Sequence, residues 1–259
     1  MSFRRRLFPD FEVAHIDGTG LAFEKHTHDE FVIGVNIQGE EHVWLDGHEM
    51  DVGPAHVTLY NPGEVQAGTV QGGPWRFVSF YVPPAVLPAL IGLPAHVVFA
   101  RPILGDAVLA TTVRALADDA LAGVLDEGEI GERMVSVLAG LFRVAGARPS
   151  RIGRASPPVA RVAERLRDSL EQTPSLQALA ADEGLSAVQL VRAFRRAHGL
   201  PPLAWLFQQR LHEARRRLTR GERPALVAAD LGFADQAHLT RRFKAAFGVT
   251  PARWAKGGD

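Results

Sequence analysis

The sequence predicts an α+β chain of two domains. The first is an antiparallel β barrel of jelly-roll type followed by helices, and the second is an all-α domain with two helix-turn-helix units. Residues 12–82 predict the barrel, because they contain β-branched and aromatic runs separated by turn residues. Residues 175–254 predict the helical domain, because one helical pattern is written there twice. The charge is also divided: residues 1–150 hold 10 Lys and Arg against 19 Asp and Glu, and residues 151–259 hold 19 against 10.

Length and composition limit the classes of protein. The 259 residues, 46% of them hydrophobic, suffice for one large domain or two ordinary ones. No run of eighteen apolar residues occurs, so we expect no membrane span. Arg4-Arg5-Arg6 is not followed by a long apolar region, so we expect no secretory signal. The absence of Cys excludes disulfides, thiolate zinc sites and a cysteine nucleophile, and it fits a cytoplasmic protein.

The first hundred residues are expected to form the barrel. Residues 1–11 show no clear periodicity, and two interpretations stay open: a frayed terminus with docked aromatic side chains, or an arm that folds over a ligand. Asp46-Gly47 predicts a hairpin and Asn61-Pro62-Gly63 a further turn. The expected strands are residues 31–37, 42–45, 57–60 and 75–82. Strands at this spacing predict an antiparallel barrel or sandwich over residues 1–100, and a jelly-roll barrel is large enough to enclose a small molecule.

Several motifs in this region resemble the cupin-type sensor domain of bacterial regulators. They are His26-Thr27-His28, the Gly39 turn, Asp46-Gly47, Gly53 and Asn61-Pro62-Gly63-Glu64. His26 and His28 alternate along a strand, so both rings could enter one cavity, as in the metal site of cupin enzymes. The set of metal ligands is incomplete. Gln66 stands where those enzymes have a further His, and Glu30 comes too soon after His28 to match their Glu. We therefore expect no metal and no cofactor.

The cupin-like resemblance instead implies a small-molecule effector inside the barrel. The candidate effector contacts are His26, His28, Glu64, Gln66 and Trp75. The two histidines have a second interpretation, packing or hydrogen bonding near the mouth of the barrel. Trp75 has an equally good interpretation as part of the core.

Residues 101–145 are expected to be helical, since apolar residues recur at helical spacing in 104–116 and in 134–142. These helices either pair two subunits or cap the open end of the barrel, and we favour dimerisation because an apolar face needs a partner surface. Residues 146–158 are rich in Gly, Pro, Ser and Arg, which predicts a flexible linker. Residues 159–259 form the second domain.

The repeat defines this second domain. Ala180-Ala181-Asp182 and Gly184 recur as Ala228-Ala229-Asp230 and Gly232, and a second set of residues recurs 49 positions on. That set is Leu190, Arg192, Phe194, Ala197, Gly199, Pro202 and Trp205, matched by Leu239, Arg241, Phe243, Ala246, Gly248, Pro251 and Trp254. In each copy a short helix is expected to end at a Gly, and a capping residue, Ser186 or Asp235, then starts a second helix. A long helix that starts at Pro201-Pro202 and is stopped by Gly221 joins the copies.

Each second helix is expected to be amphipathic. Leu190, Phe194 and Ala197 face a core in the first copy, and their repeats do so in the second. The opposite faces carry polar and basic residues. Leu203, Phe207, Leu211, Ala214 and Leu218 are expected to form the buried stripe of the long helix, with Arg215, Arg216 and Arg217 in solvent and some of them near phosphate. Two basic helices presented by two turns suit two successive visits to the major groove.

The second copy resembles the signature of the AraC/XylS family of bacterial transcription regulators. The matching residues are Leu231-Gly232-Phe233-Ala234-Asp235-Gln236-Ala237-His238-Leu239-Thr240-Arg241-Arg242-Phe243-Lys244 and Gly248-Val249-Thr250-Pro251. The resemblance implies a seven-helix DNA-binding domain with two helix-turn-helix units, often preceded by a sensor domain. It also implies double-stranded DNA, a homodimer and RNA polymerase as partners, with activation as the commoner mode.

The candidate DNA contacts are the exposed residues of the two repeated helices: Val188, Gln189, Arg192, Arg195, Arg196, Gln236, Ala237, His238, Thr240, Arg241 and Lys244. Val188 cannot hydrogen-bond a base, so the second helix is the better candidate for sequence discrimination. Arg192 and Arg241 have an alternative role in phosphate contact or in an intramolecular ion pair.

The sequence therefore predicts a transcription regulator controlled by a small molecule, and not an enzyme. Two alternatives stay open: a metal-dependent cupin enzyme fused to a DNA-binding domain, and a constitutive DNA binder whose barrel only dimerises. The incomplete ligand set argues against the first of these.

Overall fold

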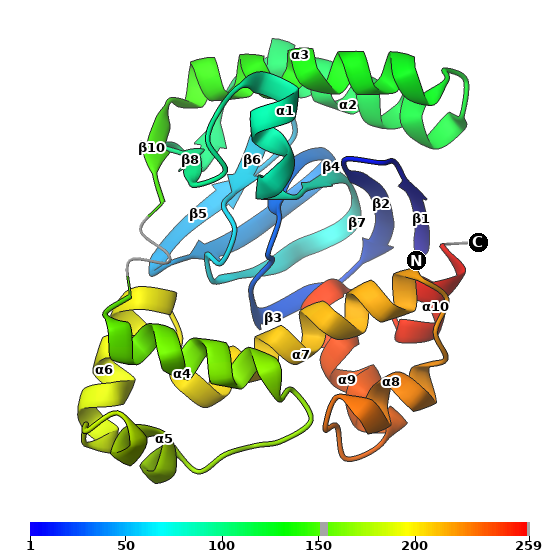
Figure 1. Cartoon of the computed structure of the whole chain (residues 1–259). Coiled ribbons are helices and arrows are strands. Elements are labelled where there is room, and N and C mark those ends of the chain that lie inside the picture. Colours follow the sequence, from blue (N-terminus) through cyan, green and yellow to red (C-terminus); the bar gives the residue numbers. More distant parts are fainter. Residues whose placement is uncertain (151–154, 258–259) are drawn as a thin grey trace. The chain divides into compact units, whose positions relative to one another are not determined.

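A computed structural model of the chain describes residues 1–150 and 155–257. Contacts between residues divide it into an amino-terminal unit, Met1–Ser150, and a carboxyl-terminal unit, Arg151–Lys256. Strands form the framework of the first unit, and helices are the regular elements of the second (Figure 1). In the described part of the chain, no helix is long and apolar enough to cross a membrane.

One antiparallel sheet forms the framework of the amino-terminal unit. Its main path runs β1 (Ser2–Leu7), β2 (Glu12–Thr19), β7 (Gln66–Val82), β4 (Phe31–Leu45), β6 (Val57–Tyr60) and β9 (Ile103–Leu104). Off this path, β3 (Ala22–His26) pairs with β7, and β5 (His48–Val52) pairs with β4. Within the described residues β1 and β9 do not pair with each other, so the sheet curls without closing completely. The predicted sheet-rich architecture is confirmed, although the barrel is open.

Two long strands bend this sheet. The expected strands 31–37 and 42–45 are both part of β4, and the expected strand 75–82 is the second half of β7. The pairing of β4 with β7 shifts register between Asn36 and Glu40, around Gly39 with its φ of +83°. Such bulges bend a strand, and Gly reaches this backbone conformation without strain. The two halves of β4 and β7 therefore contribute to two walls with an interior between them.

The main core of this unit lies between one face of the sheet and a layer of helices. Phe31, Ile33 and Val35 of β4 alternate toward this core, as do Val78, Phe80 and Val82 of β7. The covering elements are η1 (Pro84–Val86), α1 (Leu87–Ile91), α2 (Ala107–Ala122) and α3 (Glu127–Ala145). Asp106 caps α2, and Asp126 forms a capping box with Glu129 at the start of α3. Helices α2 and α3 lie where helical periodicity placed them.

The structure differs from expectation at both ends of this unit. Residues 2–7 are neither frayed nor a free arm: β1 pairs with β2 along its length, and Phe3 is fully buried. In the expected linker 146–158, β10 (Ala147–Pro149) pairs with β8 (Val97–Phe99), and Pro157 already begins a helix. Residues 151–154 of that linker lie outside the described residues.

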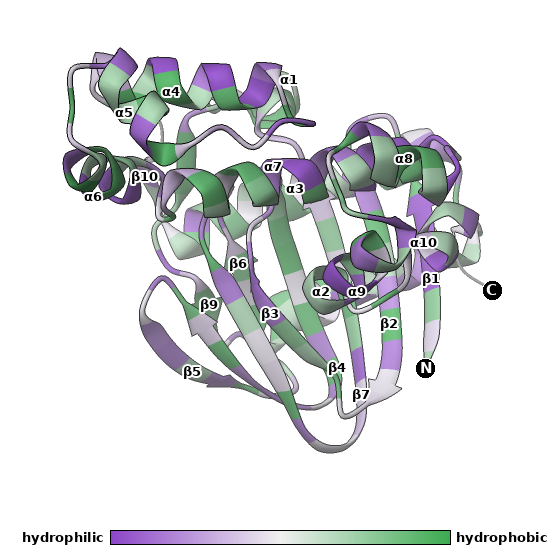
Figure 2. Cartoon of the chain, turned by 90° about the horizontal axis from the view of Figure 1, so that it is seen from below, coloured by the Kyte–Doolittle hydropathy of each residue, from purple (hydrophilic) through white to green (hydrophobic). Residues whose placement is uncertain are grey.

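Seven helices form the described carboxyl-terminal unit: α4 (Pro157–Asp168), α5 (Leu176–Asp182), α6 (Ala187–His198), α7 (Pro202–Thr219), α8 (Pro224–Asp230), α9 (Gln236–Phe247) and α10 (Pro251–Lys256). Helices α4 and α6 contact α7, and α5 packs on α6. Helices α8 and α10 also contact α7, and α9 packs on both of them. Hydrophobic and hydrophilic residues alternate along these helices, as expected of amphipathic segments (Figure 2). The fold therefore contains two helix-turn-helix units joined by α7.

Helix α7 departs from the predicted pattern at several positions. Leu203 is exposed and Phe207 only half-buried, whereas Trp205, Leu206, Leu211, Ala214 and Leu218 are buried. Arg215 is buried, with its guanidinium carbon 5.3 Å from the centre of the Trp254 ring. Arg217 is paired with Glu222 and Asp230, at 2.6 and 2.5 Å. These two side chains are therefore structural, and the expectation that they lie in solvent was wrong.

Candidate nucleic-acid interface and ligand site

The two turns that present α6 and α9 have the same local construction. Gly184 and Gly232 have φ of +66° and +70°, the left-handed conformation that glycine adopts without strain. In each turn the next residue returns a backbone hydrogen bond: Leu185 N–H donates to the Ala180 carbonyl at 2.9 Å, and Phe233 N–H to the Ala228 carbonyl at 3.1 Å. This equivalence shows that the sequence repeat is a structural repeat.

Each presented helix is capped at both ends. The Ser186 hydroxyl accepts from the Gln189 N–H at 3.2 Å, and the Asp235 carboxylate accepts from the His238 N–H at 2.5 Å. Gly199 and Gly248 end the helices in the left-handed conformation. The exposed residues of the first turns are therefore held by caps, on helix ends whose dipoles favour phosphate.

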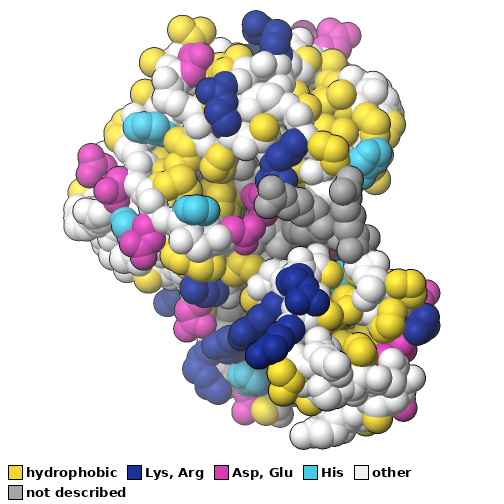
Figure 3. All heavy atoms as spheres, turned by 90° about the vertical axis from the view of Figure 1, so that its left-hand side faces the viewer, with side chains coloured by type: hydrophobic (Ala, Val, Ile, Leu, Met, Phe, Trp, Pro, Cys, Tyr) yellow, Lys and Arg dark blue, Asp and Glu magenta, His cyan; other side chains and the backbone are white. Residues whose placement is uncertain are grey.

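The predicted DNA contacts share one solvent-facing side on each helix. On α6, Val188, Gln189, Arg192, Arg195 and Arg196 are exposed, opposite the buried Leu190 and Phe194. On α9, Gln236, Ala237, Arg241 and Lys244 are exposed, and His238 and Thr240 are half-buried. Lys and Arg side chains gather on the surface of this unit (Figure 3).

The cations of these faces form no ion pairs with other described residues of the chain. Within the described residues, Arg192, Arg195, Arg196, Arg241 and Lys244 form no ion pair. Arginines elsewhere in the unit do: Arg161 pairs with Glu183, Arg165 with Asp182 and Arg217 with Glu222. The contrast disfavours the intramolecular role considered for Arg192 and Arg241, and it leaves a positive surface suited to a polyanion.

Local hydrogen bonds limit what three of the polar residues can offer to DNA. The Gln189 Oε1 atom accepts from the Ser186 N–H at 2.8 Å, which leaves its amide hydrogens as donors. The Thr240 hydroxyl donates to the Gln236 carbonyl at 2.8 Å, so its oxygen is left as an acceptor. His238 accepts from the Ala234 N–H at 3.3 Å, and its ring stacks on Phe207, with centroids 6.2 Å apart. His238 is therefore partly a packing residue.

Sequence reasoning missed Arg210, which ties the two helix-turn-helix units together from α7. Its buried guanidinium donates to the carbonyls of Leu170 (2.5 Å) and Gln172 (2.9 Å) in the loop after α4. It also donates to the Gly232 carbonyl in the second turn, at 3.4 Å. Burial lowers the pKa of Arg210, and the nearby Glu171 partly opposes this shift. The signal in the sequence was a charged residue beside Leu211 on the buried side of a helix.

Three of the predicted effector residues meet in the interior of the amino-terminal unit. His26 Nε2 lies 3.1 Å from His28 Nε2 and 3.1 Å from Gln66 Nε2, and all three side chains are buried. His26 Nδ1 lies 2.8 Å from the Glu24 carbonyl, so it carries the proton and Nε2 is the acceptor. The His28 ring lies against Tyr81 of the opposite wall, with centroids 5.4 Å apart. No group of three or more His, Cys, Asp or Glu suited to a metal ion occurs among the described residues.

The other two predicted effector residues lie apart from this cluster. Glu64 accepts from the N–H and the side-chain amide of Asn61, both at 2.9 Å, and pairs with Arg148 of β10 at 3.2 Å. Glu64 therefore connects the turn that contains Asn61 to strand β10, which precedes the linker. Trp75 is buried and stacks on Phe77, with ring centroids 5.2 Å apart, and its Nε1 has no hydrogen-bond partner in the described structure. An effector role for these five residues stays a prediction.

The interior also contains polar residues that sequence reasoning missed. Glu41, Asn36, Thr58, Tyr60 and Ser79 are buried there. A signal was present for Glu41: in Glu41-x-Val43-x-Leu45, strand alternation places the glutamate on the same side as two buried apolar residues. Asn36, Thr58 and Ser79 gave no such signal, because their strands are buried on both faces.

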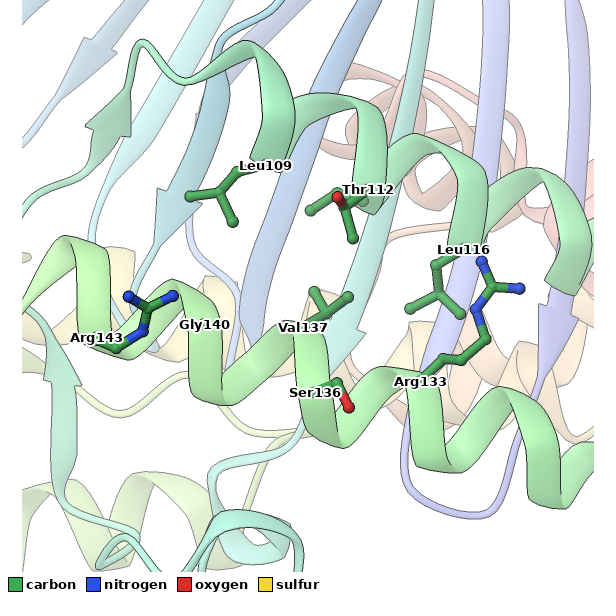
Figure 4. Close-up of a pocket in the computed structure, with 9 residues that line it drawn as sticks. Leu109, Thr112, Leu116, Arg133, Ser136, Val137, Gly140 and Arg143 are labelled. Carbon is green, nitrogen blue, oxygen red and sulfur yellow. The ribbon is translucent and has the colours of Figure 1, made fainter.

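A groove of about 270 Å³ lies between α2 and α3. Figure 4 shows Leu109, Thr112 and Leu116 of α2 along one side and Val137 of α3 along the other. Arg133 closes part of it and pairs with Asp119 at 2.5 Å. This mixed apolar and basic surface lies on the helices for which dimerisation was expected.

A helical unit with two capped, cation-bearing helices, linked to a curled sheet with a polar interior, defines a helix-turn-helix transcription regulator with a sensor domain. The AraC-like ligand binding domain family matches residues 8–189, and the helix-turn-helix domain family matches residues 179–257. The chain belongs to the AraC family of transcription regulators, and the resemblance found in its sequence is confirmed.

Individual relatives agree with this assignment. The uncharacterized HTH-type transcriptional regulator YbfI of Bacillus subtilis (strain 168) is 25% identical over 244 residues, which cover 88% of this chain and 85% of that protein. The transcriptional activator NphR of Rhodococcus sp. is 37% identical over 83 residues, which cover 32% of this chain but only 24% of NphR. The crystal structure of ToxT from Vibrio cholerae, with an unsaturated fatty acid bound, has a TM-score of 0.64 at 10% identity and covers 96% of both chains. That similarity concerns the fold.

Proposed function

We propose that this chain is a cytoplasmic, homodimeric transcription activator that binds double-stranded DNA through α6 and α9 and responds to a small molecule in the interior of its sheet unit. The observation that supports this most directly is the set of five exposed cations on α6 and α9, left unpaired within the described residues beside two capped helix starts. Activation and contact with RNA polymerase are proposed from the family, and the homology of the DNA-binding region to the activator NphR agrees with them. An enzymatic role is not proposed.

In the proposed complex, phosphate contacts supply most of the affinity and the start of α9 supplies most of the discrimination. Arg241 reads a guanine edge, since it is exposed and unpaired within the described residues. Gln189 donates to an acceptor on a base or a phosphate, because its own oxygen is held by Ser186. Thr240 accepts from a base amino group. Arg192, Arg195, Arg196 and Lys244 contact phosphates.

The experiment is a titration of the Arg241→Ala variant against its own promoter DNA and against random DNA. Loss of a bidentate base contact costs about 1–3 kcal/mol on the specific site and much less on random DNA. Lys256→Ala, at the exposed end of α10, is the matched control. Equal losses on both DNAs would move Arg241 from base reading to phosphate contact, and no binding of the unmodified chain to either DNA would refute the proposed function.

We propose that the effector site communicates with the linker through Glu64. The carbonyl of His28 accepts from the Gly63 N–H at 2.7 Å, so the histidine cluster is joined to the turn that Glu64 closes. Glu64 in turn pairs with Arg148, two residues before the end of the unit. Arg148→Gln should weaken the transcriptional response to effector while leaving DNA affinity intact. A response of unchanged size in a reporter assay would exclude this route.

We place the dimer contact on α2 and α3. Val108 of α2 is 76% exposed, and Leu109 and Val137 line the apolar part of the groove. Leu109→Arg should convert the dimer to a monomer in sedimentation measurements, because it introduces a charge at the centre of this surface. An unchanged mass would show that the subunits meet elsewhere.

A further inference from the structure

In the part of the chain that the structure describes, the interior of the sheet unit contains a buried carboxyl group without a partner. Glu41 lies on β4 opposite Val70 of β7 and Val52 of β5, both buried, and it is only 8% exposed. Within the described residues its carboxyl group forms neither a hydrogen bond nor an ion pair. Burial raises its pKa to about 7. An isolated buried carboxylate is costly to a folded protein, so this group either keeps a proton or needs a compensating positive charge beside it.

The strand beneath Glu41 is shaped to hold this carboxyl group. A β-carbon on Gly68 would overlap Glu41 Oε1. The backbone of Gly68 is not in the left-handed region, so it is the missing side chain that matters here and not conformational freedom. Gln66 and Gly68 face the same side of β7, about 6.6 Å apart along the strand. The carboxyl group of Glu41 therefore extends the row of polar groups that begins with His26 and Gln66.

The opposite wall offers further hydrogen-bonding atoms that have no partner among the described residues. Thr58 and Ser79 are both paired with Gly34 in the sheet, so they share a face, and both are buried; the Ser79 hydroxyl has no partner in the described structure. The Asn36 side-chain amide donates to the carbonyl of Val52, the β5 residue paired with Glu41, at 2.8 Å. Its Oδ1 atom has no hydrogen-bond partner in the described structure. Burial, and then the charge of Glu41, raise the pKa of Tyr60 on this wall.

Acceptors predominate in this set. Asn36 Oδ1, Gln66 Oε1 and the Glu41 carboxylate accept only, and the hydroxyls accept or donate. The rings of Phe77 and Tyr81 belong to the same wall. Each lies two positions from Ser79 along β7, so all three side chains face the same side of the strand. A carboxylate, neutral acceptors and aromatic rings together match a positively charged organic group that has several N–H donors.

We propose that this interior binds a small organic cation, a protonated amine, amidine or guanidine, with Glu41 as its counter-ion and Asn36, Gln66 and Ser79 as acceptors. This inference rests on the proposed function, because it names the chemical class of the effector. It separates this chain from ToxT, whose solved complex holds an unsaturated fatty acid. A carboxylate ligand at this place would meet the carboxyl group of Glu41, and like charges repel.

The test uses the full chain at pH 7 and three matched sets of compounds, measured by calorimetry. The cations are benzylamine, benzamidine and butylamine. The neutral matches are benzyl alcohol, benzamide and butanol, and the anionic matches are benzoate and butyrate. At least one cation should bind, and Glu41→Gln should weaken that binding at least tenfold. Glu40→Gln, at the exposed neighbouring position, should leave the affinity unchanged.

A second readout reports the charge of Glu41 directly. In protein labelled with 13C at the glutamate carboxyl carbon, the Glu41 signal is the one missing from Glu41→Gln. Binding of a cation should shift this signal to that of the ionised form. Binding of the neutral or anionic sets alone, or cation binding that Glu41→Gln does not weaken, would overturn the cation proposal and leave a ligand site of other chemistry. If no set bound, the cation proposal would fall, and so would the effector role proposed for this interior.

Discussion

Replacing Glu41 with Gln should change how the stability of the amino-terminal unit depends on pH. Burial raises the pKa of Glu41 from 4.5 to about 7. Between these values the folded unit keeps a proton that the unfolded chain has lost, so stability falls as pH rises through this window. This loss of stability is absent below pH 4.5 and complete above pH 7. A difference of about 2.5 pKa units corresponds to about 3 kcal/mol, and Gln, which has nearly the same shape and no charge, should remove it.

Urea denaturation at pH 4.5, 6 and 8 measures this effect. All three methionines, Met1, Met50 and Met134, lie in residues 1–150, so 13C-methyl methionine signals report the unfolding of this unit alone. Met134 is fully buried in the core and gives the clearest signal. The variant should match the parent at pH 4.5 and exceed it by about 3 kcal/mol at pH 8. Parallel pH profiles for the two proteins would refute an unpaired, buried Glu41.

Three further predictions concern the carboxyl-terminal unit. Arg210→Met should cost about 2–4 kcal/mol of stability and weaken binding to DNA with both half-sites more than binding to one half-site, which gel shifts would show; equal losses would limit Arg210 to stability. Gly184→Ala should cost about 1–2 kcal/mol of stability, because alanine is strained in the left-handed backbone conformation of this residue. Gly232→Ala should cost more, because its added β-carbon would also clash with the Glu171 carbonyl. Equal shifts in melting temperature for the two variants would contradict this. Burial lowers the pKa of His198 to about 4, with Arg167 adding to the effect, so its ring should stay neutral as pH falls through 6.5, and stability should decrease from there to pH 4; an NMR titration midpoint near 6.5 would disprove it.

Much of the carboxyl-terminal unit could be predicted because its signals are local. In each copy the glycine, the capping residue and the spaced apolar residues lie within a few positions of each other. The same pattern occurs in both copies, so each copy supports the interpretation of the other. Arg210 could not be assigned in the same way. Its partners lie in a loop about 40 residues earlier and in a turn 22 residues later, so only the three-dimensional fold shows that a charged side chain belongs in the interior.

The sheet unit was harder to predict for a related reason. Periodicity located the strands, but a bulge near Gly39 joined two of them into β4 and changed which side its residues face. Residues 2–7 carry three arginines in a row, which masked a strand that is fixed by pairing with β2. His26, His28 and Gln66 were found because a family motif marked them. Glu41 belongs to no such motif, and its carboxyl group occupies the space that a side chain at position 68 would fill, which only the fold reveals.

The fixed union of α6 and α9 through α7 has a consequence for the operator. The two exposed faces differ in sequence, with Gln189 and Arg192 on one and Gln236 and Arg241 on the other. The stretch of DNA that a single chain recognises therefore has no internal two-fold symmetry, unlike the palindromes read by dimers of a single helix-turn-helix. Such a stretch has a direction, so inverting it within a promoter would reverse the orientation of the bound protein relative to the gene.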